Sequence, residues 1–131
     1  MAIVAPSFLA ANFLQLQSAV DLVNQSAAEW LHIDVMDGMF VPNISFGMPV
    51  LQALRSATSK VCDVHLMIEQ PERYINDFKQ AGADVITVHI EASRHLHRTL
   101  QQIKSLGCKA GVAINPHTPV NSIQEVLHLA D

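Results

Sequence analysis

The sequence alternates between short apolar segments typical of buried strands and longer segments in which apolar residues recur at helical spacing. The expected strands are residues 3–7, 30–36, 61–68, 84–91 and 109–115. Such alternation is typical of a parallel sheet in which right-handed helical crossovers join successive strands. The pattern therefore predicts an α/β fold built from about five βα units.

Several local signals place the expected helices between these strands. Asn12 can serve as an N-cap, and Pro71 suits a first helical turn. Gly82 and Gly107 are typical helix stops, and a last helix is expected after Pro119. Between the expected strand 30–36 and the next helix, which carries Val50, Leu51 and Leu54, residues 37–47 form a long loop with apolar residues, which we interpret as a flap over a site.

Composition indicates one globular domain covering residues 1–131, because 50% of the residues are hydrophobic and 15% are charged. The formal net charge is −4, and no Lys or Arg precedes Arg55. We therefore expect no nucleic-acid partner and no secretory signal. No apolar run approaches the roughly 20 residues that span a membrane. These features predict a cytoplasmic protein without a membrane partner. Cys62 and Cys108 lack C-x-x-C spacing, so we expect them to be structural thiols.

Polar side chains gather at the C-terminal end of every expected strand: Ser7, Asp34, His65, His89 and Asn115. A (β/α)8 barrel builds its active site at this edge of all its strands. An open doubly wound sheet would instead bind a ligand at one switch point, with a Gly-rich loop after the first strand, and residues 7–11 contain no Gly. We therefore predict a TIM (β/α)8 barrel, of which this chain supplies about five of eight units.

Two neighbouring strands combine histidine and carboxylate side chains on one face. Side chains alternate along a strand, so His32 and Asp34 share a face, as do Asp63 and His65. Burying an unpaired carboxylate costs several kcal/mol, which favours a bound cation as its partner. A set of two His and one carboxylate suits one divalent ion, namely zinc, ferrous iron, manganese or cobalt. The predicted metal ligands are His32, Asp34 and His65. We expect the remaining histidines to be solvated, except His89, whose partner could be Glu91.

Several segments resemble the ribulose-phosphate 3-epimerase family along the whole chain. They are APSFLAA at 5–11, LHIDVMDG at 31–38, FVPN at 40–43, DVHLM at 63–67 and AINP at 113–116. The resemblance implies a metal-dependent isomerase that interconverts D-ribulose 5-phosphate and D-xylulose 5-phosphate. It also implies that a second acid/base Asp and Gly-rich phosphate loops belong to strands outside this sequence.

By position, the resemblance implies roles for individual residues. On this resemblance, Asp34 would be one catalytic acid/base as well as a metal ligand, and Ser7 and His65 would contact the phosphosugar substrate. Met36 and Met67 match methionines that line the reaction plane. Thioether sulfurs would form a polarisable wall nearly free of water, although packing in a core is the simpler use of these residues.

Two other functions stay open at the level of the sequence. One is a phosphosugar decarboxylase on a similar barrel, a family that tends to place a Lys near the carboxylates, whereas no Lys is expected on the inward faces here. The other is a metal-binding or assembly fragment without turnover. Unpaired edges at strands 3–7 and 109–115 would favour association, so we expect a homo-oligomer.

Overall fold

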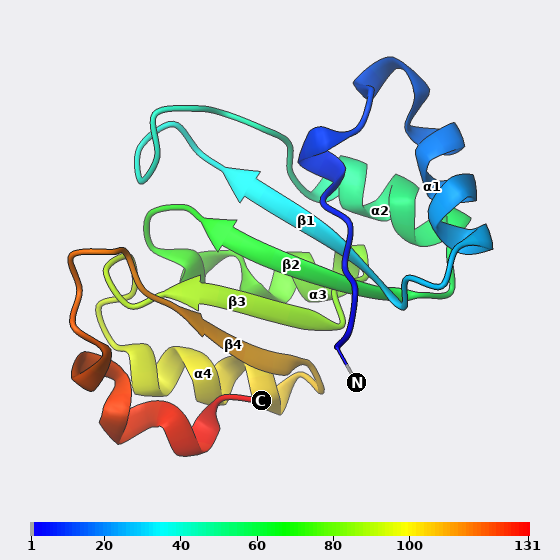
Figure 1. Cartoon of the computed structure of the whole chain (residues 1–131). Helices are drawn as coiled ribbons and strands as arrows, with labels where there is room; N and C mark the ends of the chain where they lie inside the picture. The colour runs from blue at the N-terminus through cyan, green and yellow to red at the C-terminus, as the bar shows by residue number, and fades with distance from the viewer. Residues whose placement is uncertain (1) are drawn as a thin grey trace.

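The computed structural model describes residues 2–131 and contains one parallel sheet with the strand order β1-β2-β3-β4 (Figure 1). The strands are β1 (Trp30–Met36), β2 (Val61–Met67), β3 (Val85–His89) and β4 (Lys109–Ala113). The helices are α1 (Leu16–Gln25), α2 (Met48–Ala57), α3 (Ile75–Ala81) and α4 (Leu96–Ser105). Spatial order follows chain order, as in consecutive units of a (β/α)8 barrel, which confirms the predicted α/β class.

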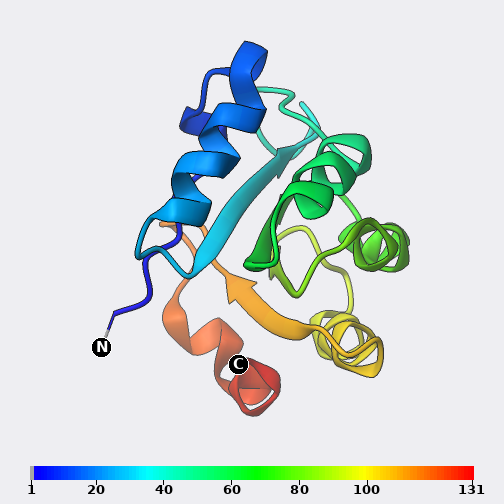
Figure 2. The same ribbon diagram turned by 90° about the vertical axis from the view of Figure 1, so that its right-hand side faces the viewer.

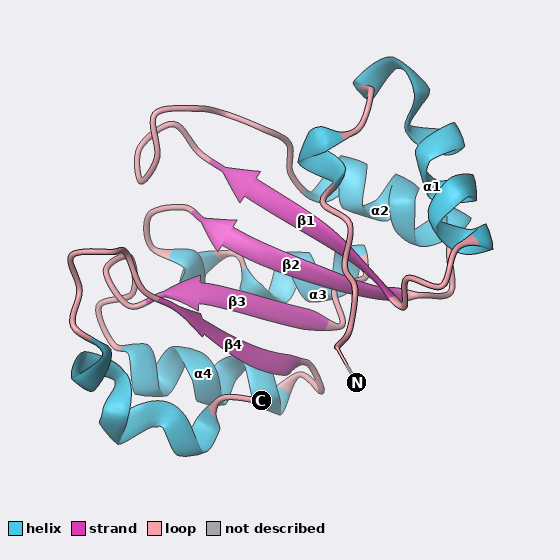
Figure 3. Cartoon of the chain, in the orientation of Figure 1, coloured by secondary structure: helices cyan, strands magenta, loops and turns pink. Residues whose placement is uncertain are grey.

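The first predicted strand, residues 3–7, is wrong as a strand, because this segment is drawn as a loop beside β1 (Figure 3). Only an isolated parallel bridge joins Ser7 to His32, whose backbone N–H donates to Pro6 O at 3.0 Å. Pro6 has no N–H to extend the ladder. Ser7 already caps the 3₁₀ helix η1 (Phe8–Ala10), so the segment occupies the expected place without forming a strand.

The predicted helix signals lie at real helix ends. The Asn12 side chain accepts a hydrogen bond from Leu14 N at the start of the 3₁₀ helix η2 (Phe13–Gln15), which leads into α1. Pro71 begins the 3₁₀ helix η3 (Pro71–Arg73) before α3, and Gly82 ends α3 at a φ of 114°. The last helix, expected after Pro119, is the 3₁₀ helix η4 (Val120–Leu129) and has no side-chain cap.

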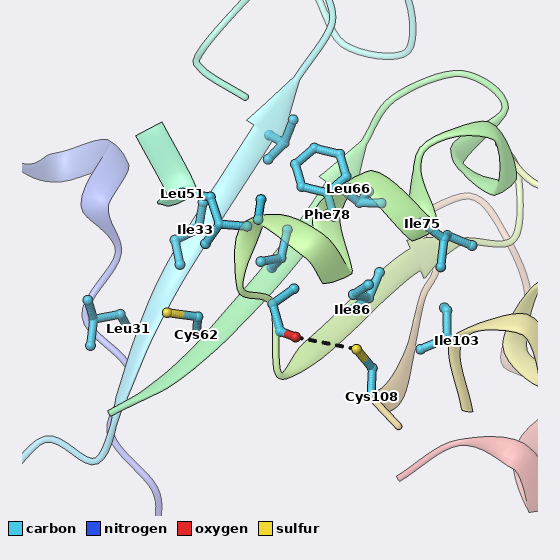
Figure 4. Close-up of a cluster of buried hydrophobic side chains, with 14 of the residues drawn as sticks. Leu31, Ile33, Leu51, Cys62, Leu66, Ile75, Phe78, Ile86, Ile103 and Cys108 are labelled. Atoms are coloured by element: carbon cyan, nitrogen blue, oxygen red, sulfur yellow. Dashed lines mark hydrogen bonds between the residues drawn. The ribbon is translucent and has the colours of Figure 1, made fainter. Parts of the chain in front are cut away.

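One face of the sheet is covered by helices and forms the hydrophobic core (Figure 2). Buried and half-buried residues alternate along β1 and β2, as the sequence pattern predicts. Figure 4 shows members of this core, which include Leu31, Ile33, Leu66, Phe78 and Ile86.

Cys62 and Cys108 are buried in this core as free thiols, which confirms the prediction that they are structural. The Cys108 thiol donates to Ala83 O at 3.3 Å (Figure 4). Burial raises the pKa of both thiols. The two thiols are therefore inert packing groups rather than nucleophiles or metal ligands.

The opposite face of the sheet, here called the polar face, carries His32, Asp34, Asp63 and His65. Its curvature is strong enough that Lys109 Nζ on β4 lies 5.8 Å from the ring centroid of Trp30 on β1. Lys109 therefore lies on this face, contrary to the expectation that no Lys does, but at the N-terminal end of its strand. In residues 2–131, no helix is both long enough and apolar enough to cross a membrane.

Candidate metal centre

The register of β1 against β2 assembles the predicted ligand set. His32 pairs with Asp63, Asp34 pairs with His65, and each pair lies side by side on the polar face. One ligand atom each from His32, Asp34 and His65 lies within 4.8 Å of the others. The structure thus brings all three predicted ligands together on neighbouring strands.

The geometry of these three side chains fits a metal ion. Asp34 Oδ1 lies 3.1 Å from His32 Nε2 and 3.2 Å from His65 Nδ1, so two imidazole nitrogens converge on one carboxylate oxygen. Their side chains are 27%, 14% and 21% exposed, in chain order, which leaves an ion accessible from the polar face. Two nitrogen donors and one oxygen donor could therefore hold a metal with positions left open.

Asp34 is held as a carboxylate by its neighbours. Ser7 Oγ donates to Asp34 Oδ2 at 2.7 Å, which places Ser7 at the site as predicted. Burial alone would raise the pKa of Asp34, but the Ser7 hydrogen bond and the interactions with His32 and His65 lower it below its usual range. Asp34 is therefore ionised at neutral pH, and both of its carboxylate oxygens have partners: Oδ2 contacts Ser7, and Oδ1 contacts His32 and His65.

Asp63 contacts the candidate ligand set, and the sequence analysis gave it no role. Its Oδ2 lies 2.7 Å from His32 Nδ1, and this hydrogen bond, opposed by burial, is the main reason that the pKa of His32 is raised. A carboxylate on the far nitrogen fixes the ring and leaves Nε2 to face Asp34, as in many metal-binding histidines. The signal was present in the sequence, since aligning the two strands in parallel register sets His32 against Asp63.

His65 differs from His32 in its surroundings. Burial and the neighbouring His89 lower the pKa of His65, and the hydrogen bond with Asp34 only partly offsets this effect. A lowered pKa favours the neutral imidazole, which is the form that binds metals. His65 Nδ1 faces Asp34, so this nitrogen is the one available to an ion at the site.

Met36 and Met67 are register partners at the ends of β1 and β2. Each lies two residues beyond Asp34 or His65 on the same face and is half-buried. The structure therefore places both methionines beside the candidate metal centre, toward the C-terminal edge of the sheet. Met36 also lines a pocket of about 310 Å³ between the ends of these strands and α3.

The loop at 37–47 covers part of this edge. Asp37 anchors it, because Oδ1 accepts from Met39 N and Phe40 N while Oδ2 accepts from Glu69 N. The Phe40 ring packs on His89 with a centroid distance of 4.9 Å. Met39 and Ile44 are 78% and 74% exposed, so the predicted flap covers the site through Phe40 and not through these two residues.

The remaining histidines divide as the sequence suggested. His95, His97, His117 and His128 are exposed. His89 is only 7% exposed and contacts the metal centre, with its Nε2 2.8 Å from His65 Nε2. Its polar strand face was the signal for this position, although the contact with His65 required the register of β2 against β3.

Comparison with known proteins identifies the family. A model of the ribulose-phosphate 3 epimerase family matches residues 3–131. A ribulose-phosphate 3-epimerase of Synechocystis is 52% identical over 98% of this chain and 57% of its own length. One from Bacillus subtilis is 54% identical over 94% of this chain and 57% of its own length.

A chloroplastic ribulose-5-phosphate-3-epimerase of Arabidopsis thaliana is 53% identical over 98% of this chain and 47% of its own length. The chain thus spans about half the length of these curated relatives. The match runs through the strands that carry His32, Asp34 and His65. On these grounds, the chain belongs to the ribulose-phosphate 3-epimerase family.

Proposed function

We propose that the protein containing this chain is a ribulose-phosphate 3-epimerase that interconverts D-ribulose 5-phosphate and D-xylulose 5-phosphate at C3. The observation that carries the proposal is the position of Asp34. It is an ionised, half-buried carboxylate at the junction of Ser7, His32 and His65. Family membership supplies the identity of the substrate.

Epimerisation next to a ketone removes a proton from one face of a carbon and returns a proton to the other. Asp34 is the group on this chain that can accept the C3 proton, because its pKa is held low and Ser7 fixes its orientation. His32, Asp34 and His65 would hold one divalent ion. When bound, the ion supplies Lewis-acid stabilisation of charge that develops on the substrate oxygens.

Other residues of the polar face shape the site. His65 and Ser7 lie where they can contact the substrate, and Met36 and Met67 form an apolar edge that holds no competing acid or base. We assign the second acid/base group and the phosphate anchor to parts of the protein outside residues 1–131. The relatives are nearly twice as long as the matched region, which leaves room for both.

The competing functions are weaker on structural grounds. A decarboxylase of the kind considered above would need a Lys close to Asp34, and Lys109, the lysine found on the polar face, lies beside Trp30 at the N-terminal end of the strands. A metal-binding fragment without turnover would use the same ligand set, so activity is what separates it from the epimerase. A homo-oligomer and a cytoplasmic location stay predictions.

The test is the variant Asp34→Asn in the natural protein that contains these residues, because Asn keeps the shape and loses the base. We expect epimerase turnover to fall by at least about 100-fold, with the far-UV circular dichroism unchanged. The matched control is Asp77→Asn on the exposed side of α3, which should be fully active. Near-normal turnover of Asp34→Asn would contradict the proposal, as would wild-type protein that binds metal but lacks activity.

A further inference from the structure

His65 and His89 meet through their Nε2 atoms, which lie 2.8 Å apart. The two rings stack with a centroid distance of 5.0 Å and an interplanar angle of 22°. A neutral imidazole carries one proton, so a hydrogen bond between two such nitrogens requires one donor and one acceptor. The proton positions of the two rings are therefore coupled.

Metal binding by His65 determines which ring donates. The nitrogen of His65 that faces the candidate ligand set is Nδ1, 3.2 Å from Asp34 Oδ1. A metal-binding nitrogen carries no proton, so the His65 proton must then be on Nε2 and point at His89. His89 Nε2 becomes the acceptor, and the proton of His89 must be on Nδ1.

The surroundings of His89 Nδ1 suit that proton. This atom is buried and makes no well-directed hydrogen bond within residues 2–131, while Glu91 Oε2 lies 3.4 Å away, close enough for an ion pair. Glu91 is itself fixed, because its Oε1 accepts from Asn115 N at 2.6 Å and from Thr118 Oγ1. A protonated Nδ1 would therefore face a carboxylate oxygen that is already held in place.

We propose that His89 is a positioning residue that sets the metal-binding tautomer of His65, and that Glu91 sets the tautomer of His89 in turn. This inference rests on the metal centre of the proposed function. In the loaded site, His65 Nε2–H donates to His89 Nε2, and His89 Nδ1–H donates to Glu91 Oε2. The far nitrogen of a metal-binding His is commonly held by a carboxylate or another acceptor, and here a second imidazole transmits the carboxylate's effect.

Without a metal, the protons take the opposite arrangement. His65 Nδ1–H donates to Asp34 Oδ1, and His89 Nε2–H donates to His65 Nε2. This leaves His89 Nδ1 without a proton opposite the Glu91 carboxylate. Each ring holds one proton in both arrangements, so the change moves protons within the rings and consumes none.

Burial makes His89 difficult to replace by water. The residue is 7% exposed, and the Phe40 ring packs on it at 4.9 Å. When its acceptor is removed, His65 Nε2–H would be a buried donor with no partner, which carries a cost in free energy. In the other arrangement His65 Nε2 carries no proton and loses a donor instead, so Zn²⁺ affinity falls by the difference between these two costs.

The experiment compares His89→Leu with His89→Gln by competing Zn²⁺ from the protein with a chromophoric chelator. Leu fills the space without an acceptor, whereas Gln offers a carbonyl oxygen to His65 Nε2–H. We expect Zn²⁺ affinity to fall about 10–100-fold in His89→Leu and to recover most of the loss in His89→Gln. The control His97→Leu removes an exposed histidine on α4 and should bind Zn²⁺ like the wild type.

A second readout reports the tautomer directly. Long-range ¹H–¹⁵N spectra of the Zn²⁺-loaded wild type and of His89→Gln should show His65 protonated at Nε2, with protonated Nδ1 at His89 in the wild type. Equal Zn²⁺ affinity of His89→Leu and wild type would overturn the positioning role. Equal weakness of the Leu and Gln variants, or a His65 proton on Nδ1 in the loaded protein, would also overturn it.

The design separates this inference from the metal centre beneath it. Zn²⁺ binding that is abolished by His65→Ala but untouched by His89→Leu would leave the metal centre intact and reject the role of His89. Wild-type protein that binds no Zn²⁺ more tightly than His65→Ala would reject both. If His89→Leu does not fold, the affinity and spectrum of His89→Gln decide the question alone.

Discussion

The two faces of the sheet are built from alternating residues of the same strands, yet they differ in what holds them together. On the helix-covered face, Leu31 and Ile33 are fully buried among apolar side chains. On the polar face, the neighbouring His32 and Asp34 keep 27% and 14% of their side chains exposed and contact polar groups. One face contributes stability through burial, and the other carries a hydrogen-bonded network that includes the candidate metal ligands.

This difference predicts which substitutions the protein tolerates. In the described residues, His32, Asp34, Asp63 and His65 lie outside the hydrophobic core, so the proposed function, rather than packing, accounts for their identity. The residues that bind a ligand are commonly less than optimal for stability. Substitutions at neighbouring positions of one strand should therefore have different effects: those on the helix-covered face should lower stability, and those on the polar face should weaken metal binding.

The largest effect on stability is expected for Ile33→Ala on β1. Removing three methyl or methylene groups from a fully buried site should lower the free energy of unfolding by about 2–5 kcal/mol. Asp34→Asn, one residue away, should cost much less stability while abolishing tight Zn²⁺ binding. Urea unfolding and Zn²⁺ competition on both variants check the pair. A smaller loss of stability for Ile33→Ala than for Asp34→Asn would break the distinction between the faces.

Much of this arrangement could be predicted from the sequence, because alternation along a strand fixes which residues share a face. The set His32, Asp34 and His65 follows from that rule once β1 and β2 are taken as parallel neighbours. The helix ends at Asn12 and Gly82 follow equally from local side-chain and backbone chemistry.

What the sequence did not reveal depends on register and on competition between local structures. The role of Asp63 and the contact of His65 with His89 require the offset of each strand against the next. The prediction of a strand at 3–7 was wrong because an apolar pattern does not show which backbone N–H groups are available for hydrogen bonds with a neighbouring strand. Pro6 lacks an N–H, and Ser7 is committed to the cap of η1.

A smaller loss of stability is expected from substitution at one crowded point on the polar face. Thr87 lies between His65 and Gly111 in the register, and a Cβ at position 111 would overlap Thr87 Oγ1 and lie 3.0 Å from Thr87 Cβ. Gly111→Ala should therefore lower the free energy of unfolding by about 1–3 kcal/mol. Adding Thr87→Ala should recover part of this loss, as measured by a double-mutant cycle. Additive losses would show that the two positions do not touch.

The smallest effect concerns Asp37, which follows β1 and anchors the loop at 37–47. Burial would raise its pKa, but backbone hydrogen bonds from Glu69, Met39 and Phe40 lower it overall. Asp37→Asn keeps an acceptor for Met39 and Phe40 but turns an amide toward Glu69 N, so we expect a loss of about 1 kcal/mol at pH 7.

The pH dependence of this loss distinguishes the charge of Asp37 from its shape. A carboxyl group whose pKa is lowered by folding stabilises the protein above its unfolded value, near 3.8, and loses that contribution as the pH falls through the lower folded value. The difference in stability between wild type and Asp37→Asn should therefore be constant at neutral pH and shrink below about pH 4. Urea unfolding from pH 7 to pH 3 measures it, with exposed Asp77→Asn as the control. A difference that persists unchanged at low pH would mean that Asp37 acts through packing, and that the ionised anchor of the loop contributes nothing to the stability of this edge.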